Sequence, residues 1–238
     1  MDHSPRAARP SLGRAFGAGT QLELRIGMTD DITVVPANDA SWDDLQAVYG
    51  TRGDAAFCQC QRFKLAPKES FGSFPAEERA YRLRAQTNSG VPDAETTSGL
   101  VAYLDGEPVG WCGVEPRANY SGLRRVFRVP WDGRSEDKAD PTVWSVTCFV
   151  VRKGFRHRGI AYALARAAAE FARDRGARAV EGYPMITQPG QDVTWGEMLV
   201  GNRSIFAAAG FTEVSHPTPR RVVMRIDFHP EQGGAAHG

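Results

Sequence analysis

The sequence lacks a long hydrophobic run and carries almost no net charge. No apolar stretch approaches the ~20 residues that a membrane-spanning helix needs, and the arginines near the N-terminus are not followed by a continuous apolar core, which argues against a secretory signal. Lys and Arg together number 29 and Asp and Glu 28, giving a formal net charge of +1. Because such a chain has no overall field to attract polyanions, we expect neither a nucleic-acid nor a membrane partner.

Cysteine is also scarce, with four residues in the chain, Cys58, Cys60, Cys112 and Cys148. So few thiols fit a reducing, cytoplasmic location better than a disulfide scaffold. Cys58 and Cys60 supply only two potential metal ligands, and no matching Cys or His pair lies nearby, so we expect no metal site. The favoured interpretation is two small cysteines packed beside Phe57 and Phe63. A reactive thiol, or a segment that lines a pocket without reacting, stays open.

The length of 238 residues suits a single domain of moderate size with terminal extensions. Residues 1–27 are rich in Arg, Ala, Gly and Pro and show no hydrophobic period, so they are expected to be disordered or to be an upstream extension. Met28 resembles a natural start. The domain is predicted to cover residues 28–229, and residues 230–238 are predicted to form a disordered tail.

Residues 146–176 form the stretch around which the rest is organised. β-Branched residues up to Val151 predict a half-buried strand, and Ile160, Leu164, Ala168 and Phe171 repeat at helical spacing. The loop between them is basic and contains the small residue Gly159. A helix N-terminus exposes unpaired N–H groups, so this junction favours binding of a phosphorylated anion, and a diphosphate is the expected ligand.

Two segments resemble the GNAT superfamily of N-acetyltransferases. The spacing Arg156-x-x-Gly159-x-Ala161 after a strand resembles the family's acyl-CoA signature, and residues 201–211, from Gly-Asn through to Gly-Phe, resemble its last helix. The resemblance covers roughly residues 30 to 228. It implies an α+β fold with a mixed sheet, mostly antiparallel and twisted, with flanking helices and one parallel β-α-β crossover.

Other patterns agree with this fold. Strands are predicted at residues 32–35, 99–104, 108–114, 142–151, 177–183, 211–214 and 221–226, and the Asp105-Gly106 pair predicts a hairpin. Helices are predicted from Trp42, over residues 75–86, after Gly159 and after Asn202. Residues 116–141 and 184–201 are predicted to be long loops, and the first of them is expected either to lie near the acceptor site or to be a mobile surface loop.

The resemblance implies acetyl-CoA as co-substrate and a primary amine of a small molecule or peptide as acceptor, with direct transfer of the acetyl group. Main-chain groups of the strand would hold pantetheine, the loop amides would hold the diphosphate, and the last helix would contact the cofactor. The implied cofactor-binding residues are Cys148, Phe149, Val150, Val151, Arg156, His157, Arg158, Gly159, Ile160, Ala161, Asn202 and Phe206.

Phe206 stands where many family members carry a tyrosine that protonates the departing thiolate, and phenylalanine cannot donate a proton. The candidates for general acid or base are Glu181 and Glu115 first, followed by Glu197, Tyr183 and His216. A non-catalytic acyl-CoA-binding or regulatory module therefore stays open as the alternative. A nucleic-acid-binding module built on the arginine clusters is disfavoured by the charge balance. A homodimer is compatible with the sequence.

Overall fold

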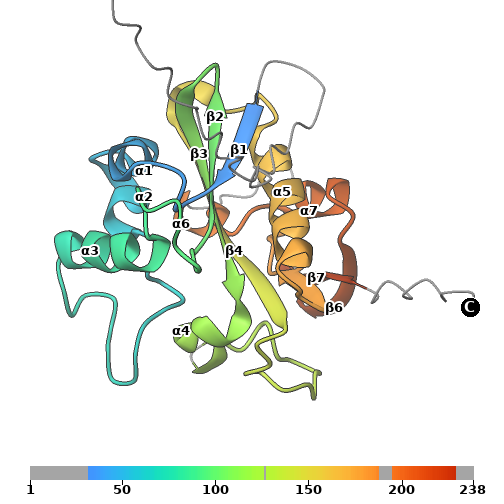
Figure 1. The fold of residues 1–238 in the computed structure, drawn as a ribbon. Helices are drawn as coiled ribbons and strands as arrows, with labels where there is room; N and C mark the ends of the chain where they lie inside the picture. Colours follow the sequence, from blue (N-terminus) through green and yellow to red (C-terminus); the bar gives the residue numbers. More distant parts are fainter. Residues whose placement is uncertain (1–31, 126, 188–194, 229–238) are drawn as a thin grey trace, which may run out of the picture.

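The computed structural model describes residues 32–125, 127–187 and 195–228, which contain a mixed sheet with helices on both faces (Figure 1). In chain order the strands are β1 (Ile32–Pro36), β2 (Leu100–Leu104), β3 (Glu107–Pro116), β4 (Val143–Val151), β5 (Ala179–Gly182), β6 (Thr212–Thr218) and β7 (Arg221–Asp227). The sheet order is β1-β2-β3-β4-β5-β7-β6. Among the described strands only β4 and β5 pair in parallel, which confirms the predicted sheet.

The helices are α1 (Trp42–Tyr49), α2 (Gly53–Cys58), α3 (Ala76–Thr87), α4 (Ser121–Arg125), α5 (Ile160–Asp174), α6 (Trp195–Met198) and α7 (Arg203–Ala208). Figure 1 shows α1–α3 on one side of the sheet and α5 with α7 on the other. Each side has its own hydrophobic core. Trp111, Cys148 and Val150 face the α1 side, whereas Val146 and Phe149 face α5.

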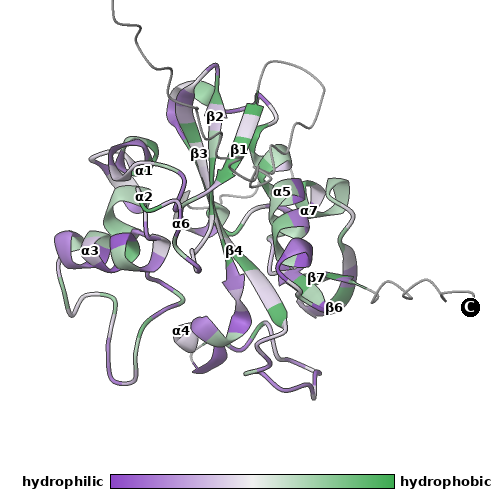
Figure 2. Cartoon of the chain, viewed as in Figure 1, coloured by the Kyte–Doolittle hydropathy of each residue, from purple (hydrophilic) through white to green (hydrophobic). Residues whose placement is uncertain are grey.

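Helix α5 is amphipathic, and Figure 2 shows hydrophobic and hydrophilic residues on different parts of its surface. Its small alanines let it lie close to the sheet, and its first residue, Ile160, sits over Gly110 of β3. A Cβ atom at position 110 would lie 2.7 Å from Ile160 Cγ2, so glycine permits this close approach. The contact fixes the N-terminus of α5 beside the end of β4.

Strand β4 contains a β-bulge at Thr147. Its register with β3 pairs Cys148 with Gly113 and Val146 with Val114, so Thr147 has no partner. A bulge lets two successive side chains turn toward the same face, and Thr147 and Cys148 both face the α1 side. Pairing of β4 with β5 also stops at Val146, so the second half of β4 is released from β5.

Two sequence expectations need correction. The segment predicted as a long polar loop at residues 116–141 contains α4 and the 3₁₀ turn Arg117–Asn119, and it buries Tyr120, Leu123 and Trp131 in a third core. The last hairpin also differs, because β6 continues through His216 and Pro217. An edge strand tolerates proline, which cannot donate to a ladder. The predictions for residues 1–27 and 230–238 lie outside the described residues.

Candidate active site

The junction between β4 and α5 has the predicted form. Gly159 is the N-cap of α5 with a φ of 80°, and a Cβ atom there would meet nothing within 4 Å. No side chain caps the helix, and the amides of Tyr162 and Ala163 both donate to the Gly159 carbonyl. No acceptor in the described part of the chain takes the amide hydrogens of Ile160 and Ala161. The first turn therefore presents open N–H groups to an anion.

Basic side chains surround this turn. The guanidinium groups of Arg152 and Arg158 lie 5.1 and 5.6 Å from the centre of the Phe155 ring. Arg152 also pairs with Glu107 at 2.8 Å, whereas His157 and Arg158 are exposed. Arg156 Nε lies 3.4 Å from the Val151 carbonyl oxygen, which ties the loop to the end of β4. The cluster adds positive charge beside the open amides, as a diphosphate requires.

The part of β4 beyond Val146, which does not pair with β5, is partly covered by the segment around Leu199. The sequence did not predict this contact. The Phe149 amide donates to the Leu199 carbonyl oxygen at 2.6 Å. Phe149 was predicted to pair with pantetheine, so that pairing requires Leu199 to move away from the strand. The side chains of Cys148 and Val150 are buried beneath α1, so a ligand that lies along this part of β4 would pair with its main chain.

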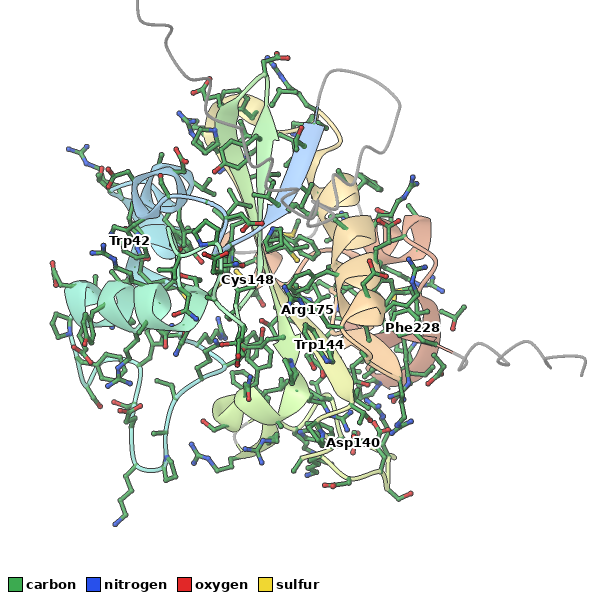
Figure 3. All side chains as sticks on the ribbon, in the orientation of Figure 1. Trp42, Asp140, Trp144, Cys148, Arg175 and Phe228 are labelled. Atoms are coloured by element: carbon green, nitrogen blue, oxygen red, sulfur yellow. The ribbon has the colours of Figure 1, made fainter. Side chains whose placement is uncertain are left out.

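A cavity of about 440 Å³ opens on the α1 side of β4, over the bulge. In Figure 3, Cys148 lies near the middle of the molecule, between helices α1–α3 and α5. Four aromatic rings line the cavity: Phe57, Phe63, Phe71 and Phe127. Its polar lining consists of Asp54, Cys58, Cys60, Arg62, Thr147 and Cys148. Such a pocket can receive an apolar molecule that carries a few polar groups.

The aromatic rings that line the cavity form a wall, and the buried side chain of Arg79 holds part of this aromatic wall together. The sequence pattern of helix α3 did not suggest this role for Arg79. Its guanidinium donates to the carbonyl oxygens of Phe57, Phe71 and Phe74 at 2.5 to 3.1 Å and stacks on the Phe57 and Phe71 rings, 4.0 and 4.8 Å from their centres. These contacts join α2 and the loop before α3 into one surface. The nearest sequence signal was the recurrence of phenylalanine at positions 57, 71 and 74 ahead of the predicted helix over residues 75–86.

The placement of Glu181 does not support its prediction as a general acid or base. Its carboxylate is fully buried and accepts hydrogen bonds from Arg117, Arg134, Arg225 and Tyr183 at 2.7 to 3.3 Å. Burial alone would raise its pKa, but the charges of Arg134 and Arg117 outweigh burial and lower the pKa. A carboxylate with four donors and a lowered pKa is a poor proton acceptor, so Glu181 is a structural ion-pair centre.

Glu115 is likewise committed elsewhere. It forms an ion pair with Lys64, accepts from the Ser98 hydroxyl at 2.7 Å, and accepts from the Asn119 amide at 3.0 Å. It faces a separate polar hollow that includes Gln86 and does not line the aromatic cavity. The prediction of Glu115 as a catalytic base therefore finds no support in its placement.

The two predicted contacts from the last helix have structural roles here. The Asn202 side chain caps α7 by accepting from the Ile205 amide at 3.1 Å. Phe206 is fully buried, with its ring centre 5.6 Å from that of Phe149 and 5.1 Å from that of Phe211. A direct contact between Phe206 and the cofactor, as predicted, is therefore not available in this conformation.

Within residues 32–125, 127–187 and 195–228, no group of three or more His, Cys, Asp or Glu side chains is placed to hold a metal ion. No helix in the same ranges is both long and apolar enough to cross a bilayer.

Solved structures with a similar fold include the GNAT domain of PAT from S. lividans, with 19% identity, 83% of this chain and 90% of that chain covered, and a TM-score of 0.45. Another is yncA from Salmonella typhimurium, described as a putative acetyltransferase with its cofactor acetyl-CoA, with 14% identity, 87% of this chain and 99% of that chain covered, and a TM-score of 0.46. A GCN5-related N-acetyltransferase from Kribbella flavida matches at 18% identity, with 83% and 98% coverage and a TM-score of 0.45. No curated protein matches the chain.

A match to the sequence of a family is more direct evidence of family membership than similarity to these solved structures. Residues 61–184, just over half of the 238 residues, match the family described as "Acetyltransferase (GNAT) family". The match spans the aromatic segment after α2, the central hairpin and the β4–α5 junction. The chain therefore belongs to the GNAT family of acetyltransferases, which uses acetyl-CoA as the acetyl donor.

Proposed function

We propose that the chain is an N-acetyltransferase that moves an acetyl group from acetyl-CoA to a primary amine of a small molecule or peptide. The observation that carries this proposal is the position of the aromatic cavity, over the bulge at Thr147 and Cys148 where β4 separates from β5. Pantetheine lying along the released part of β4 would bring its thioester to the floor of this cavity. The open amides of α5 would hold the diphosphate.

The lining of the cavity favours an amine attached to an apolar or aromatic group. Phe57, Phe63, Phe71 and Phe127 supply apolar surface, and exposed Asp54 supplies a negative charge that can attract an ammonium group. The four cysteines form no disulfide, which suits a reducing, cytoplasmic location. That the domain covers residues 28–229 remains a prediction. That it forms a homodimer is also a prediction.

Substitution of Gly159 tests the cofactor site. In Gly159→Glu, a carboxylate faces the diphosphate, and a non-glycine residue is strained at a φ of 80°. Gly176→Glu is the matched control, because Gly176 has a φ of 77°, has open space around its Cβ position, and follows the other end of the same helix. We expect calorimetry to show that the Kd of acetyl-CoA rises about tenfold or more in Gly159→Glu alone. Equal affinities in both variants would reject the diphosphate site.

A non-catalytic acyl-CoA-binding module is the second candidate. It is favoured by buried Phe206, which has no proton to donate, and by the Phe149 amide, which is already bonded to Leu199. A thiol-release assay with acetyl-CoA and a panel of aryl-alkyl amines, polyamines and peptides separates the two. Release of coenzyme A above the rate without amine supports catalysis, whereas tight binding without release across the panel supports the module.

A further inference from the structure

A smaller cavity of about 140 Å³ adjoins the aromatic cavity, and we call it the annex. Four residues line both cavities: Arg62, Phe63, Phe127 and Val200. The centres of the Phe63 and Phe127 rings lie 4.6 Å apart, at the boundary between the two spaces. Thr147 and Cys148 line only the aromatic cavity, whereas Arg221 lines only the annex. A ligand that fills both cavities therefore has one end at the bulge of β4 and the other end beside Arg221.

Two arginines from distant parts of the chain meet at the annex. Arg62 follows helix α2, and its guanidinium lies 5.8 Å from the centre of the Phe127 ring. Arg221 is the first residue of β7, and a β-bridge to Met185 holds the start of that strand. The Arg221 side chain is half-buried and donates to the Tyr183 carbonyl oxygen at 3.4 Å. Both positive charges thus stand over a hollow whose other lining is largely apolar.

These two charges are not neutralised by ion pairs. No carboxylate among residues 32–125, 127–187 and 195–228 forms an ion pair with Arg62 or Arg221, and Glu197 lies 3.8 Å from Arg220 instead. Burial is the strongest influence on the pKa of Arg221 and lowers it; the charge of Glu197 opposes this effect, and the charges of Arg62 and Arg220 reinforce it. Like charges that act on one another beside an apolar hollow are stabilised by an anion between them.

The opposite end of the hollow has the opposite charge. Asp54 lines the aromatic cavity and does not line the annex. An ammonium group is therefore attracted to the aromatic cavity, and a negatively charged group is attracted to the annex. The boundary between these two ends is formed by the rings of Phe63 and Phe127, which favour an aromatic or apolar group.

We propose that the acceptor is an amine joined through an aromatic or apolar spacer to a carboxylate, and that Arg62 and Arg221 bind this carboxylate in the annex. The inference rests on the proposed function, and it names the class of acceptor. A guanidinium group has planar donors that match the two oxygens of a carboxylate, so two arginines give both charge and orientation. An α-amino acid does not satisfy this arrangement, because its amine and its α-carboxylate share one carbon and cannot reach both ends of the hollow.

The test compares para-(aminomethyl)benzoate with para-(aminomethyl)benzamide, which has nearly the same shape and no negative charge. Release of coenzyme A from acetyl-CoA gives kcat/KM for each amine with the full chain. We expect kcat/KM for the benzoate to exceed that for the benzamide about tenfold or more, because hydrogen bonds between charged partners hold only the carboxylate. Phenylalanine, an α-amino acid with the same type of ring, should show no such advantage over its own amide.

Three variants assign the preference to the annex. Arg62→Gln and Arg221→Gln should each lower kcat/KM for the benzoate about tenfold and leave kcat/KM for the benzamide unchanged. Arg128→Gln is the matched control, because it removes the same charge from an exposed side chain that pairs only with Asp132, at 3.5 Å, and lines neither cavity. It should keep the parent's ratio. The ratio of the two amines within one variant does not depend on the fraction of folded chain.

The outcomes separate this inference from the proposed function. Equal kcat/KM for benzoate and benzamide in the parent, or an unchanged ratio in Arg62→Gln and Arg221→Gln, rejects the carboxylate site while turnover supports the proposed function. If the chain binds acetyl-CoA but releases no coenzyme A with any amine, the proposed function fails. Calorimetry then decides on the annex: tighter binding of the benzoate than of the benzamide, lost in Arg221→Gln, supports the carboxylate site, and equal affinities reject it.

Discussion

Replacement of Glu181 by glutamine tests the buried ion-pair centre that joins β5 to the segment after β3. Glu181 is fully buried between Arg117, Arg134 and Arg225, whose side chains are 0%, 12% and 7% exposed. Glutamine keeps the volume, but it removes the negative charge and turns an N–H₂ group toward guanidinium donors. Loss of one partner of a buried ion pair costs about 3–5 kcal/mol, and Glu136 remains to offset part of the positive charge, so we expect about 3 kcal/mol.

Thermal unfolding measures this loss. For a domain of about this size each kcal/mol lowers Tm by roughly 2–4 °C, so Glu181→Gln should unfold about 10 °C below the parent. Glu78→Gln is the control, because Glu78 pairs with Arg82 in a partly exposed i,i+4 arrangement worth about 0.5 kcal/mol. A shift for Glu181→Gln no larger than that of the control would refute the assignment of Glu181 as a structural centre.

The remaining predictions concern acid stability, position 206 and the aromatic wall. The pKa of Glu181 is lower in the folded state than its unfolded value of about 4.3, so the carboxylate stabilises the fold above that value, and this stabilisation is lost as pH falls through the folded pKa. The Tm difference between the parent and Glu181→Gln should therefore shrink from pH 7 to pH 3. A constant difference would contradict this. Phe206→Tyr should lose about 1–3 kcal/mol in denaturant unfolding, because its hydroxyl would be buried among Phe149, Gly182 and Phe211, and it should not accelerate coenzyme A release. Arg79→Met should raise KM for the amine about tenfold while the Kd of acetyl-CoA is unchanged; equal effects on both would show that Arg79 does not act through the acceptor wall.

The sequence predicted the centre of the fold because the decisive patterns there are local. The β-branched run before Val151, the glycine at 159 and the alanine-rich helix lie within about thirty residues, and their periods differ clearly. The Asp105-Gly106 hairpin is equally local, with φ angles of 52° and 79° at the turn. Short-range geometry of this kind needs no knowledge of distant partners.

The buried ion pairs and the segment after β3 could not be predicted in the same way. Glu181 resembled a candidate base in an apolar strand, and its partners Arg117, Arg134 and Arg225 are 64, 47 and 44 residues away in sequence. Only the folded sheet brings these charges together. The segment after β3 also appeared to be polar loop, because Tyr120, Leu123 and Trp131 are separated by charged residues and show no regular period over their short helix.

Phe206 and Cys60 lie in cores on opposite faces of the sheet. Phe206 packs under α5 and α7 with Phe149, whereas Cys60 lies with Trp111 and Cys148 beneath α1. The surroundings of position 206 on the α5 side are filled by the aromatic rings of Phe149 and Phe211. Because Phe206 is fully buried and carries no proton donor, the proton for the departing thiolate in the proposed reaction must be supplied by another residue or by water.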